Sequence, residues 1–298
     1  MITQRISKLR EKMVENNVQA YIIPTSDFHE TEYVCEYFAC RKYMSGFTGS
    51  AGILVVLLDK AALWTDGRYF IQAANQLEGS GIDLMRMGQP GVPELDAYIV
   101  ENLKENDTVG FDGRVMNTKD ALAYKSVFDL AHLNMNVNLD LVNDVWTDRP
   151  ELPSTPTFHY SEKFAGESME SKLSRLRAFL KENKVDSIVL TSVDQIAWLY
   201  NLRAHDIPNF PVALAYSIVS LDSASIYMDA SRLDELSEKE FGKNNVTVCG
   251  YNDMYEATKA LNGLVLVDPS SVNYAIVSNL KAKPVFKVLP GWKCRHKH

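Results

Sequence analysis

Residues Ser7-Lys8-Leu9-Arg10 recur as Ser174-Arg175-Leu176-Arg177, which lie 167 positions further along the chain. Further matches at the same spacing are Glu15 with Glu182, Asn16 with Asn183, Val18 with Val185, Asp27 with Asp194 and Tyr33 with Tyr200. At a spacing of 163, Leu63-Trp64-Thr65-Asp66-Gly67-Arg68 meets Ile226-Tyr227-Met228-Asp229-Ala230-Ser231. Because similarity at a nearly fixed spacing is the mark of a repeated structural unit, the sequence predicts two copies of one domain.

Each copy opens with the pattern of an amphipathic helix followed by a buried strand. Apolar residues recur every three or four positions, which places them on one face of a helix. They are Ile6, Leu9 and Met13 in the first copy and Leu173, Leu176, Phe179 and Leu180 in the second. Strand-length apolar runs follow at Ala20–Ile23 and Ser187–Leu190. A further helix is predicted to begin at Asp27 and at Asp194, because Asp is favoured at helix starts.

A hairpin is predicted next in both copies. In the first, Ile53–Leu58 and Ala61–Trp64 flank the short turn Asp59-Lys60, and in the second Ile218–Leu221 is followed by Ser225–Met228. Two β-rich runs separated by a short polar turn are typical of a hairpin. Helices that alternate with single strands and a hairpin predict an α/β fold, with a mixed sheet flanked by helices in each of two tandem homologous domains.

The connector between the copies is Asp148-Arg149-Pro150-Glu151-Leu152-Pro153-Ser154-Thr155-Pro156, in which three prolines give a stiff, exposed segment. We therefore expect domains at 1–153 and 154–290. Residues 291–298 lack periodicity and break the acidic balance, so they are predicted to be an unstructured tail or an artefact of cloning or reading frame.

Composition narrows the class of protein. The 298 residues carry 38 acidic and 31 basic side chains, a formal net charge of −7, which disfavours nucleic acid as a partner. Apolar runs are strand-length, so no membrane span is predicted, and the charged N-terminus has no signal-peptide pattern, which makes the cytoplasm the expected location. The four cysteines form no Cys-x-x-Cys pair and are expected to be reduced thiols.

Common catalytic and ligand-binding motifs are missing or stand in the wrong context. The cluster Gly46–Gly52 leads into a β-rich run rather than a helix, so it predicts a tight strand entry and not a phosphate loop. Its Ser50 fails the Gly-x-Ser-x-Gly spacing of a nucleophile elbow. The six histidines are scattered and form no helical pair of metal ligands. We therefore expect no metal site in this chain.

Three blocks combine aromatic, charged and small residues more densely than a plain surface needs: 27–33, 64–70 and 196–203. A structural interpretation of the second block is favoured over substrate contact. In that interpretation Trp64 packs, Asp66 caps the next helix, Gly67 eases the turn and Arg68 pairs with a nearby carboxylate.

At these blocks the sequence resembles the cytosolic-type, three-domain Xaa-Pro aminopeptidases (aminopeptidase P, peptidase family M24). The resemblance rests on Ala20-Tyr21-Ile22-Ile23-Pro24, Asp27, His29, Glu32-Tyr33, Ser45-Gly46-Phe47, Gly49–Gly52, Trp64–Phe70, Trp146–Pro150 and Asp194–Arg203. It covers roughly residues 5 to 280, and the duplication matches the two creatinase-like N-terminal domains of that family.

The resemblance implies a parent enzyme that removes the first residue from peptides whose second residue is proline. It implies two divalent metal ions, commonly manganese, held by a C-terminal domain whose ligands match no position here. The chain alone is therefore expected to be inactive. Its two domains are expected to shape and narrow the active-site cleft and to support a homodimer. Residues implied for substrate binding are Glu32, Arg41, Asp66, Arg68 and Tyr69, with Glu32 holding the substrate α-amine.

A different class of function stays open. Aminopeptidase-like folds also serve without catalysis, as in the N-terminal module of a histone-chaperone subunit, where the surface binds proteins or peptides. A stand-alone binding module is therefore the alternative prediction, and the sequence downstream of residue 298 would separate the two.

Overall fold

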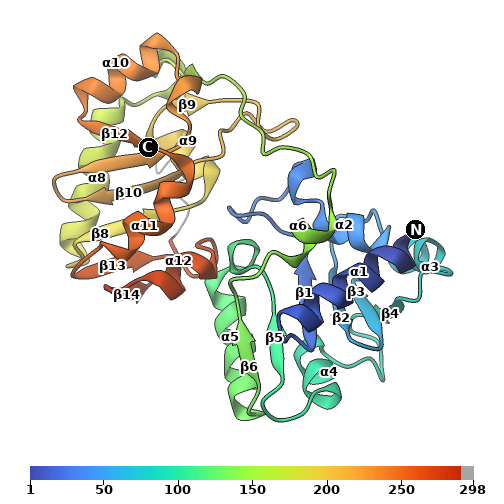
Figure 1. Ribbon diagram of the computed structural model, residues 1–298. Helices are drawn as coiled ribbons and strands as arrows, with labels where there is room; N and C mark the ends of the chain where they lie inside the picture. The colour runs from blue at the N-terminus through green and yellow to red at the C-terminus, as the bar shows by residue number, and fades with distance from the viewer. Residues whose placement is uncertain (290–298) are drawn as a thin grey trace. The chain divides into compact units, whose positions relative to one another are not determined.

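The computed structural model describes residues 1–289 and divides into two compact units (Figure 1). The first unit is Met1–Asp27 with Glu36–Glu151, and the second is Phe28–Cys35 with the chain from Leu152 onward. The chain therefore passes between the units three times, because an eight-residue segment from the first half of the sequence packs with the second half.

The first unit contains a six-stranded mixed sheet in the order β4-β3-β2-β1-β5-β6. Its central strand β1 runs antiparallel to β2 and parallel to β5. The elements are α1 (Ile2–Glu15), β1 (Ala20–Pro24), η1 (Glu36–Phe38), α2 (Cys40–Ser45), β2 (Ile53–Leu57), β3 (Ala61–Thr65), α3 (Phe70–Leu77), β4 (Asp83–Arg86), α4 (Leu95–Asn102), β5 (Thr108–Gly110), η2 (Gly113–Val115), α5 (Thr118–Leu130), β6 (Asn134–Asn136) and α6 (Leu141–Val145).

The second unit repeats this topology with the order β12-β11-β10-β8-β13-β14, and adds a two-stranded ribbon of β7 and β9. Its central strand β8 is likewise antiparallel to β10 and parallel to β13. The elements are β7 (Phe158–His159), α7 (Glu162–Ala165), α8 (Met169–Glu182), β8 (Ser187–Leu190), α9 (Val193–Leu199), β9 (Leu202–Arg203), β10 (Tyr216–Ser220), β11 (Ala224–Tyr227), η3 (Ala230–Arg232), α10 (Glu235–Lys243), β12 (Val246–Cys249), η4 (Tyr251–Asp253), α11 (Met254–Lys259), β13 (Leu264–Val267), α12 (Tyr274–Asn279) and β14 (Lys283–Phe286).

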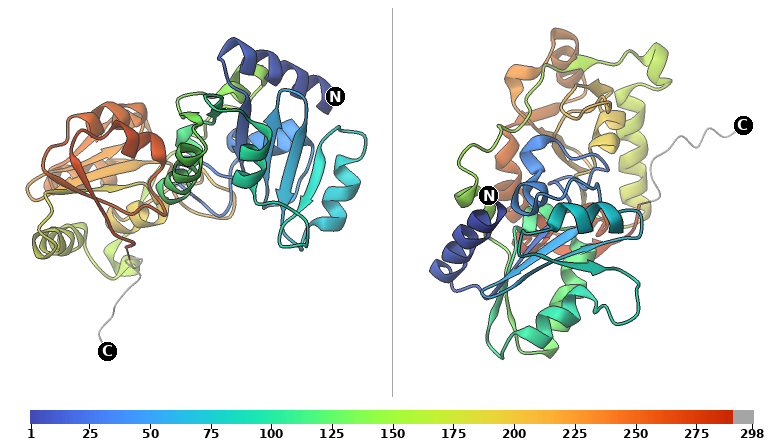
Figure 2. Two further views of the ribbon diagram at one scale, coloured as in Figure 1. Left: turned by 90° about the horizontal axis from the view of Figure 1, so that it is seen from below. Right: turned by 90° about the vertical axis from the view of Figure 1, so that its right-hand side faces the viewer.

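Each sheet carries helices on both faces (Figure 2). In the first unit, alternate strand residues pack against α1, α2, α3 and α6, and the ring of Trp64 on the opposite face meets Tyr98 of α4. The buried residues of α1 and α8 are Ile6, Leu9 and Met13, and Leu173, Leu176 and Leu180, among others. Both amphipathic helices, both central strands and both hairpins are thus confirmed, as is the mixed α/β fold class.

One element of the duplication was predicted wrongly. A helix follows β8 near Asp194, but no helix begins at Asp27, where the chain continues without regular structure to Glu36. The reason is that residues 28–35 pack with the second unit instead of with their own sheet. Tertiary contacts have overridden a local start signal here.

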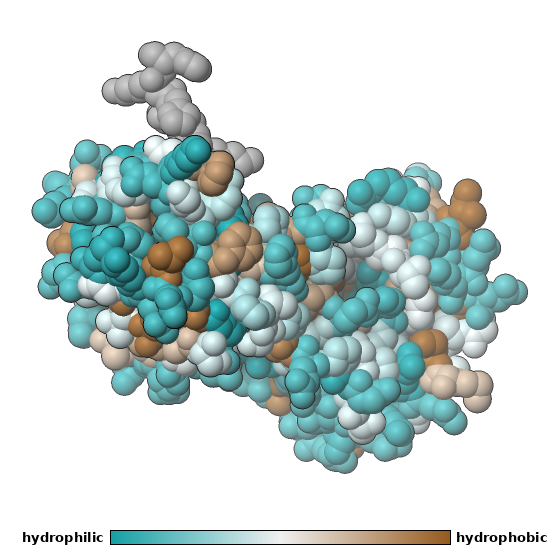
Figure 3. Space-filling view, turned by 90° about the horizontal axis from the view of Figure 1, so that it is seen from above, coloured by the Kyte–Doolittle hydropathy of each residue, from teal (hydrophilic) through white to brown (hydrophobic). Residues whose placement is uncertain are grey.

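The remaining expectations concern the ends and the thiols. Cys35, Cys40 and Cys249 are free thiols, as predicted, while Cys294 and the predicted tail 291–298 lie outside the described residues. None of the helices within residues 1–289 is long and apolar enough to cross a bilayer. On the face drawn in Figure 3, apolar side chains occur in small groups among polar ones.

Candidate functional site

Arg41 lies beneath the segment Gly46–Gly52, which we call the glycine loop. Arg41 is a residue of α2 and is 4% exposed. The guanidinium donates through Nε to Thr25 Oγ1 at 2.9 Å, through Nη1 to the carbonyl of Phe47 at 2.5 Å, and through Nη2 to the carbonyl of Gly49. Burial lowers the pKa of Arg41 to about 10. Arg41 therefore braces the glycine loop from inside, with two donors on carbonyl groups of the loop and the third on the Thr25 hydroxyl.

Close packing explains why residue 49 is a glycine. A Cβ atom built there would lie 2.2 Å from the Phe47 ring and 2.9 Å from the Tyr69 ring. The loop therefore needs glycine at this position for backbone approach rather than for phosphate binding. The predicted strand entry is observed, since β2 begins at Ile53 directly after the loop.

Tyr69 covers the outer side of the glycine loop. Its hydroxyl lies 2.6 Å from Ser50 Oγ, and its ring meets Phe47 edge-on at 5.9 Å between centroids. The hydrogen bond with Ser50 lowers the pKa of Tyr69. Ser50 therefore has a structural partner in Tyr69.

Asp66 and Arg68 form an exposed ion pair at 2.8 Å next to Tyr69. Asp66 Oδ1 also accepts the backbone N–H of Arg68 at 3.0 Å, and the guanidinium of Arg68 lowers the pKa of Asp66 to about 2. The predicted pairing of Arg68 is confirmed, and Trp64 is buried and donates to the carbonyl of Pro93. Asp66 does not cap α3, whose N-cap is Tyr69, because its carboxylate closes the preceding turn instead.

The fifth expected residue, Glu32, belongs to the other compact unit. The structure brings Arg41, Asp66, Arg68 and Tyr69 together around the glycine loop of the first unit. Glu32 is exposed and belongs to the segment that packs with the second unit. The five residues therefore form two separate sets.

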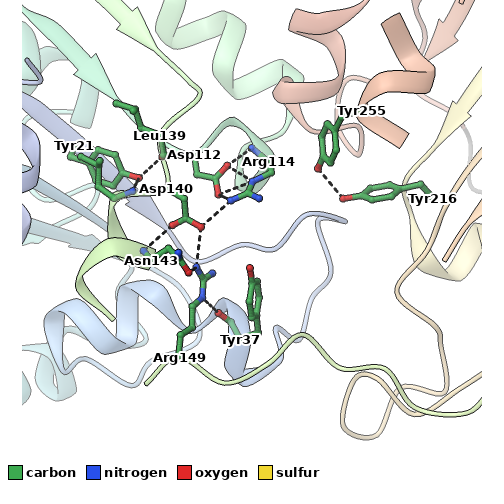
Figure 4. Close-up of polar contacts among 11 residues, drawn as sticks. Tyr21, Tyr37, Asp112, Arg114, Leu139, Asp140, Asn143, Arg149, Tyr216 and Tyr255 are labelled. Atoms are coloured by element: carbon green, nitrogen blue, oxygen red, sulfur yellow. Dashed lines mark hydrogen bonds and ion pairs between the residues drawn. The ribbon is translucent and has the colours of Figure 1, made fainter. Parts of the chain in front are cut away.

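A charged network fills the carboxyl end of the first sheet (Figure 4). Asp112, which follows β5, binds Arg114 in a bidentate pair, and Arg114 also reaches Asp140 at 2.9 Å. Asp140 is shared with Arg149, again at 2.9 Å, and Arg149 donates to the carbonyl of Tyr37. Burial raises the pKa of Asp112 in spite of its arginine partner. The negative charges of two carboxylates and the positive charges of two guanidinium groups thus neutralise each other at this largely buried end of the sheet.

This network borders a small cavity of about 20 Å³. Its lining includes Tyr21, Cys40, Asp112, Asp140 and Arg149. A cavity of this volume has room for one water molecule. Burial raises the pKa of the Cys40 thiol to about 12, so this thiol stays protonated at neutral pH. The cavity is too small for an organic substrate.

Both halves of the chain match one family. One family model, described as the creatinase/prolidase N-terminal domain, matches residues 5–138. A second family model with the same description matches residues 148–290. The chain belongs to the creatinase/prolidase N-terminal domain family, with two domains in tandem.

The chain is similar to parts of longer proteins that are named as peptidases. Aminopeptidase P2 of Arabidopsis thaliana is 38% identical over 293 residues, which are 95% of this chain and 41% of the plant protein. A protein named probable Xaa-Pro aminopeptidase P of Pyricularia oryzae is 37% identical over 87% of this chain and 42% of its own length. The X-prolyl aminopeptidase of Caenorhabditis elegans, described as a cytosolic enzyme with a di-nuclear active site, superposes with a TM-score of 0.87 at 31% identity.

The shared region is only part of those proteins. The match to the C. elegans enzyme covers 96% of this chain and 50% of that chain. Within residues 1–289, no three His, Cys, Asp or Glu side chains lie close enough together to hold a metal ion. The described part of the two creatinase/prolidase N-terminal domains therefore offers no counterpart of a di-nuclear centre.

Sequence reasoning did not find the charged network of the first domain. Asp112 directly follows a short apolar strand, and carboxylates in that position often lie at the carboxyl edge of a sheet, which was the available signal. Arg149 stands in the connector and in a block that carries the family resemblance, and neither pattern predicts an ion pair for it. Its partner Asp140 is nine residues away in an irregular segment, so no periodic pattern connects the two.

Proposed function

We propose that this chain is the N-terminal region of a Xaa-Pro aminopeptidase, a hydrolase that removes the first residue from peptides with proline in second position. The observation that carries this proposal is the similarity to such enzymes over nearly the whole chain. In this proposal the domains are those expected from the sequence, 1–153 and 154–290. They act in the cytoplasm, restrict the active-site cleft to short peptides and support a homodimer.

The chemistry of cleavage belongs, in this proposal, to two divalent metal ions held outside the two domains, and manganese is the expected metal. Two such ions activate a water molecule and polarise the scissile carbonyl. What this chain contributes is a charged group for the peptide. Glu32 is exposed on an irregular segment, so its carboxylate is accessible to the protonated α-amine of a substrate.

The test is the variant Glu32→Gln in the longer protein that contains this region, because glutamine keeps the shape of the side chain and removes its charge. We expect kcat/KM for a Xaa-Pro peptide to fall by about 10- to 100-fold, since a charge-assisted hydrogen bond to the amine is lost. Glu78→Gln serves as the matched control, because Glu78 is an exposed glutamate outside the candidate site residues. Unchanged kinetics in Glu32→Gln would remove Glu32 from the proposal.

A second measurement tests the assignment of catalysis. The purified 298-residue chain, supplied with manganese, is expected to show no Xaa-Pro hydrolysis above background. Measurable turnover that depends on added manganese would contradict the assignment. Saturable binding of peptide without turnover would instead support the alternative, a binding module without catalytic activity.

A further inference from the structure

The segment Phe28–Cys35, which we call the strap, is anchored at its root in the second domain. The side chain of Asn273 donates to the carbonyl of Phe28 at 2.9 Å. His29 is 1% exposed, and its Nδ1 lies 2.8 Å from the carbonyl oxygen of Thr191. Thr191 directly follows β8, and Asn273 is the N-cap of α12. The root of the strap is therefore held at the carboxyl end of the second sheet.

His29 is fixed through both of its ring nitrogens. The Thr191 carbonyl can only accept, which places a hydrogen on Nδ1. Nε2 lies 2.7 Å from the Tyr251 hydroxyl, and in the neutral imidazole it accepts the hydrogen of that hydroxyl. The His29 ring also packs on Tyr216, with 4.5 Å between the ring centroids. Position and rotation of the imidazole are thus both determined.

The partners of His29 belong to a cluster of tyrosines in the second domain. The hydroxyls of Tyr216 and Tyr255 lie 3.1 Å apart (Figure 4), and those of Tyr251 and Tyr216 lie 3.4 Å apart. Burial raises the pKa of Tyr216 well above its ordinary value, so this hydroxyl is neutral at pH 7. The imidazole therefore rests on a buried hydroxyl cluster supplied by β10, η4 and α11.

Beyond this root the strap turns sharply and enters solvent. Glu30 has φ 55°, a left-handed conformation that is uncommon for a residue with a side chain. Thr31 Oγ1 donates to the carbonyl of Tyr33 at 3.1 Å, which closes the tip. Glu32 and Tyr33 are exposed there, and the strap is buried again at Cys35. A rigid root thus carries an exposed carboxylate only three residues away.

We propose that His29 is a positioning residue, which fixes the root of the strap so that Glu32 is presented in one place to the amine of a peptide substrate. The part concerning the amine rests on the proposed function above. The energetic reason is preorganisation. A carboxylate on a loose loop loses conformational freedom when it binds, and a fixed root removes part of that cost before the substrate arrives.

The kinetic test is a double-mutant cycle in the longer protein, with His29→Ala, Glu32→Gln and the double variant. If His29 acts through Glu32, His29→Ala lowers kcat/KM by about tenfold through a higher KM, and adds little once Glu32→Gln is present. His29→Asn keeps a donor for the Thr191 carbonyl and is expected to retain part of the lost affinity. His205→Ala, at an exposed histidine of the same domain, is the control and leaves KM unchanged.

A role in folding alone gives a different result. It lowers the amount of active enzyme, so apparent kcat falls while KM stays constant, and the effects of His29→Ala and Glu32→Gln multiply. That pattern would overturn the proposal. If Glu32→Gln alone leaves kcat/KM unchanged, the proposed role of Glu32 fails. The anchoring of the strap by His29 is then tested by hydrogen exchange.

Hydrogen exchange in the 298-residue chain decides the anchoring. Backbone amides of residues 28–35 are expected to exchange about tenfold faster in His29→Ala and several-fold faster in Tyr251→Phe, while the strands of the second sheet keep their protection. Tyr251→Phe retains the ring and removes only the hydroxyl that bonds Nε2, so it guards against a variant that fails to fold. Unchanged exchange across the strap in both variants would overturn the proposal.

Discussion

The two domains share one topology, but different kinds of side chain close the carboxyl ends of their central strands. In the first domain, the end of β1 and β5 is closed by charges: Asp112, Arg114, Asp140 and Arg149. In the second, the equivalent end of β8 and β13 is closed by His29, Tyr216, Tyr251 and Asn273, and the one carboxylate there, Asp268, is bonded by backbone amides in place of a guanidinium. In each case, one member comes from a distant segment, namely Arg149 from the connector and His29 from the strap.

This edge of an open α/β sheet is where such folds usually bind their ligands. Within the described residues, side chains of the protein itself occupy this edge in both domains, and the charged network of the first borders a cavity of about 20 Å³. The comparison teaches that the two domains keep the same sheet but fill this edge with different side chains. Glu32, which we propose holds a substrate amine, lies on the exposed tip of the strap.

The two aspartates at equivalent strand ends show how far the chemistry diverged. Asp112 and Asp268 each accept the N–H two residues further on, from Arg114 and Ser270. Asp112 then pairs with the Arg114 guanidinium, whereas Asp268 accepts a second backbone N–H, from Leu289. The turn was retained while the charge partner was not, since backbone amides satisfy a carboxylate without any specific side chain.

The largest expected effect breaks the charged closure. Asp140→Asn keeps the cap of α6, because asparagine still accepts the N–H of Asn143, but it leaves Arg114 and the nearly buried Arg149 with less negative charge. We expect a loss of about 2 to 4 kcal/mol in the free energy of unfolding, since one partner of a buried pair is removed. Urea denaturation measures the loss.

The matched change in the second domain is Tyr251→Phe, which removes one neutral hydroxyl and is expected to cost about 1 kcal/mol. If Asp140→Asn lowers the free energy of unfolding no more than Tyr251→Phe does, the charged network of the first domain stabilises its domain no more strongly than the hydroxyl cluster stabilises the second. Arg149 lies in the connector, and Asp140→Asn weakens its ion pair. The substitution is therefore also expected to increase proteolysis near Pro150.

A smaller effect appears at alkaline pH. Burial raises the pKa of Cys40 to about 12, while the unfolded chain releases this proton near 9. Because the pKa of Cys40 is higher in the folded chain than in the unfolded chain, the contribution of this thiol to stability is fully present below pH 9 and is lost as pH rises toward 12. At pH 10 the expected loss from this group is about 1 kcal/mol. Cys40→Ala should lose less stability than the unaltered chain between pH 8 and 10.

Thiol labelling supplies the comparison between domains. The pKa of Cys249, which lies in the edge strand β12, is raised less than that of Cys40. Maleimide at pH 8 should therefore modify Cys249 well before Cys40, because the thiolate is the reactive form. Equal rates at the two cysteines would show that the interior of the first domain is open to solvent.

The sequence predicted the sheets because their cores are periodic. Ile6, Leu9 and Met13 repeat as Leu173, Leu176 and Leu180, and the hairpins carry their own turn signals. The strap could not be predicted in this way. Asp27 has the residue type of a helix start, and nothing local shows that His29 packs against Tyr216, 187 positions away.

The expected site shows the same division. The pairing of Arg68 with a nearby carboxylate was predicted, and the partner is Asp66, only two positions away, which was expected to cap a helix instead. The placement of Glu32 in the other compact unit, and the use of Arg41 as an internal brace, depend on contacts that no spacing encodes. Resemblance named these residues, but only the fold showed which of them are exposed.

The smallest expected effect concerns the two strand-end turns at Asp66 and Asp229. Each carboxylate accepts the N–H two residues on, at 3.0 Å from Arg68 and 2.9 Å from Ser231. Only the first copy adds a guanidinium, and its two side chains are 36% and 68% exposed. The low pKa of Asp66 means that this pairing adds stability above pH 4, which is lost as pH falls toward 2. Solvent screening keeps that contribution small.

Asparagine retains the oxygen that closes each turn, so Asp66→Asn and Asp229→Asn are expected to change the free energy of unfolding only slightly, and by nearly equal amounts. Urea denaturation of both variants at pH 7, in low and in high salt, measures the difference. A loss above about 1 kcal/mol in Asp66→Asn alone, abolished by salt, would show that the exposed pair stabilises the fold. Near equality instead means that Arg68 is dispensable for stability, and a kinetic effect of Arg68→Gln in the longer protein then has to come from contact with substrate.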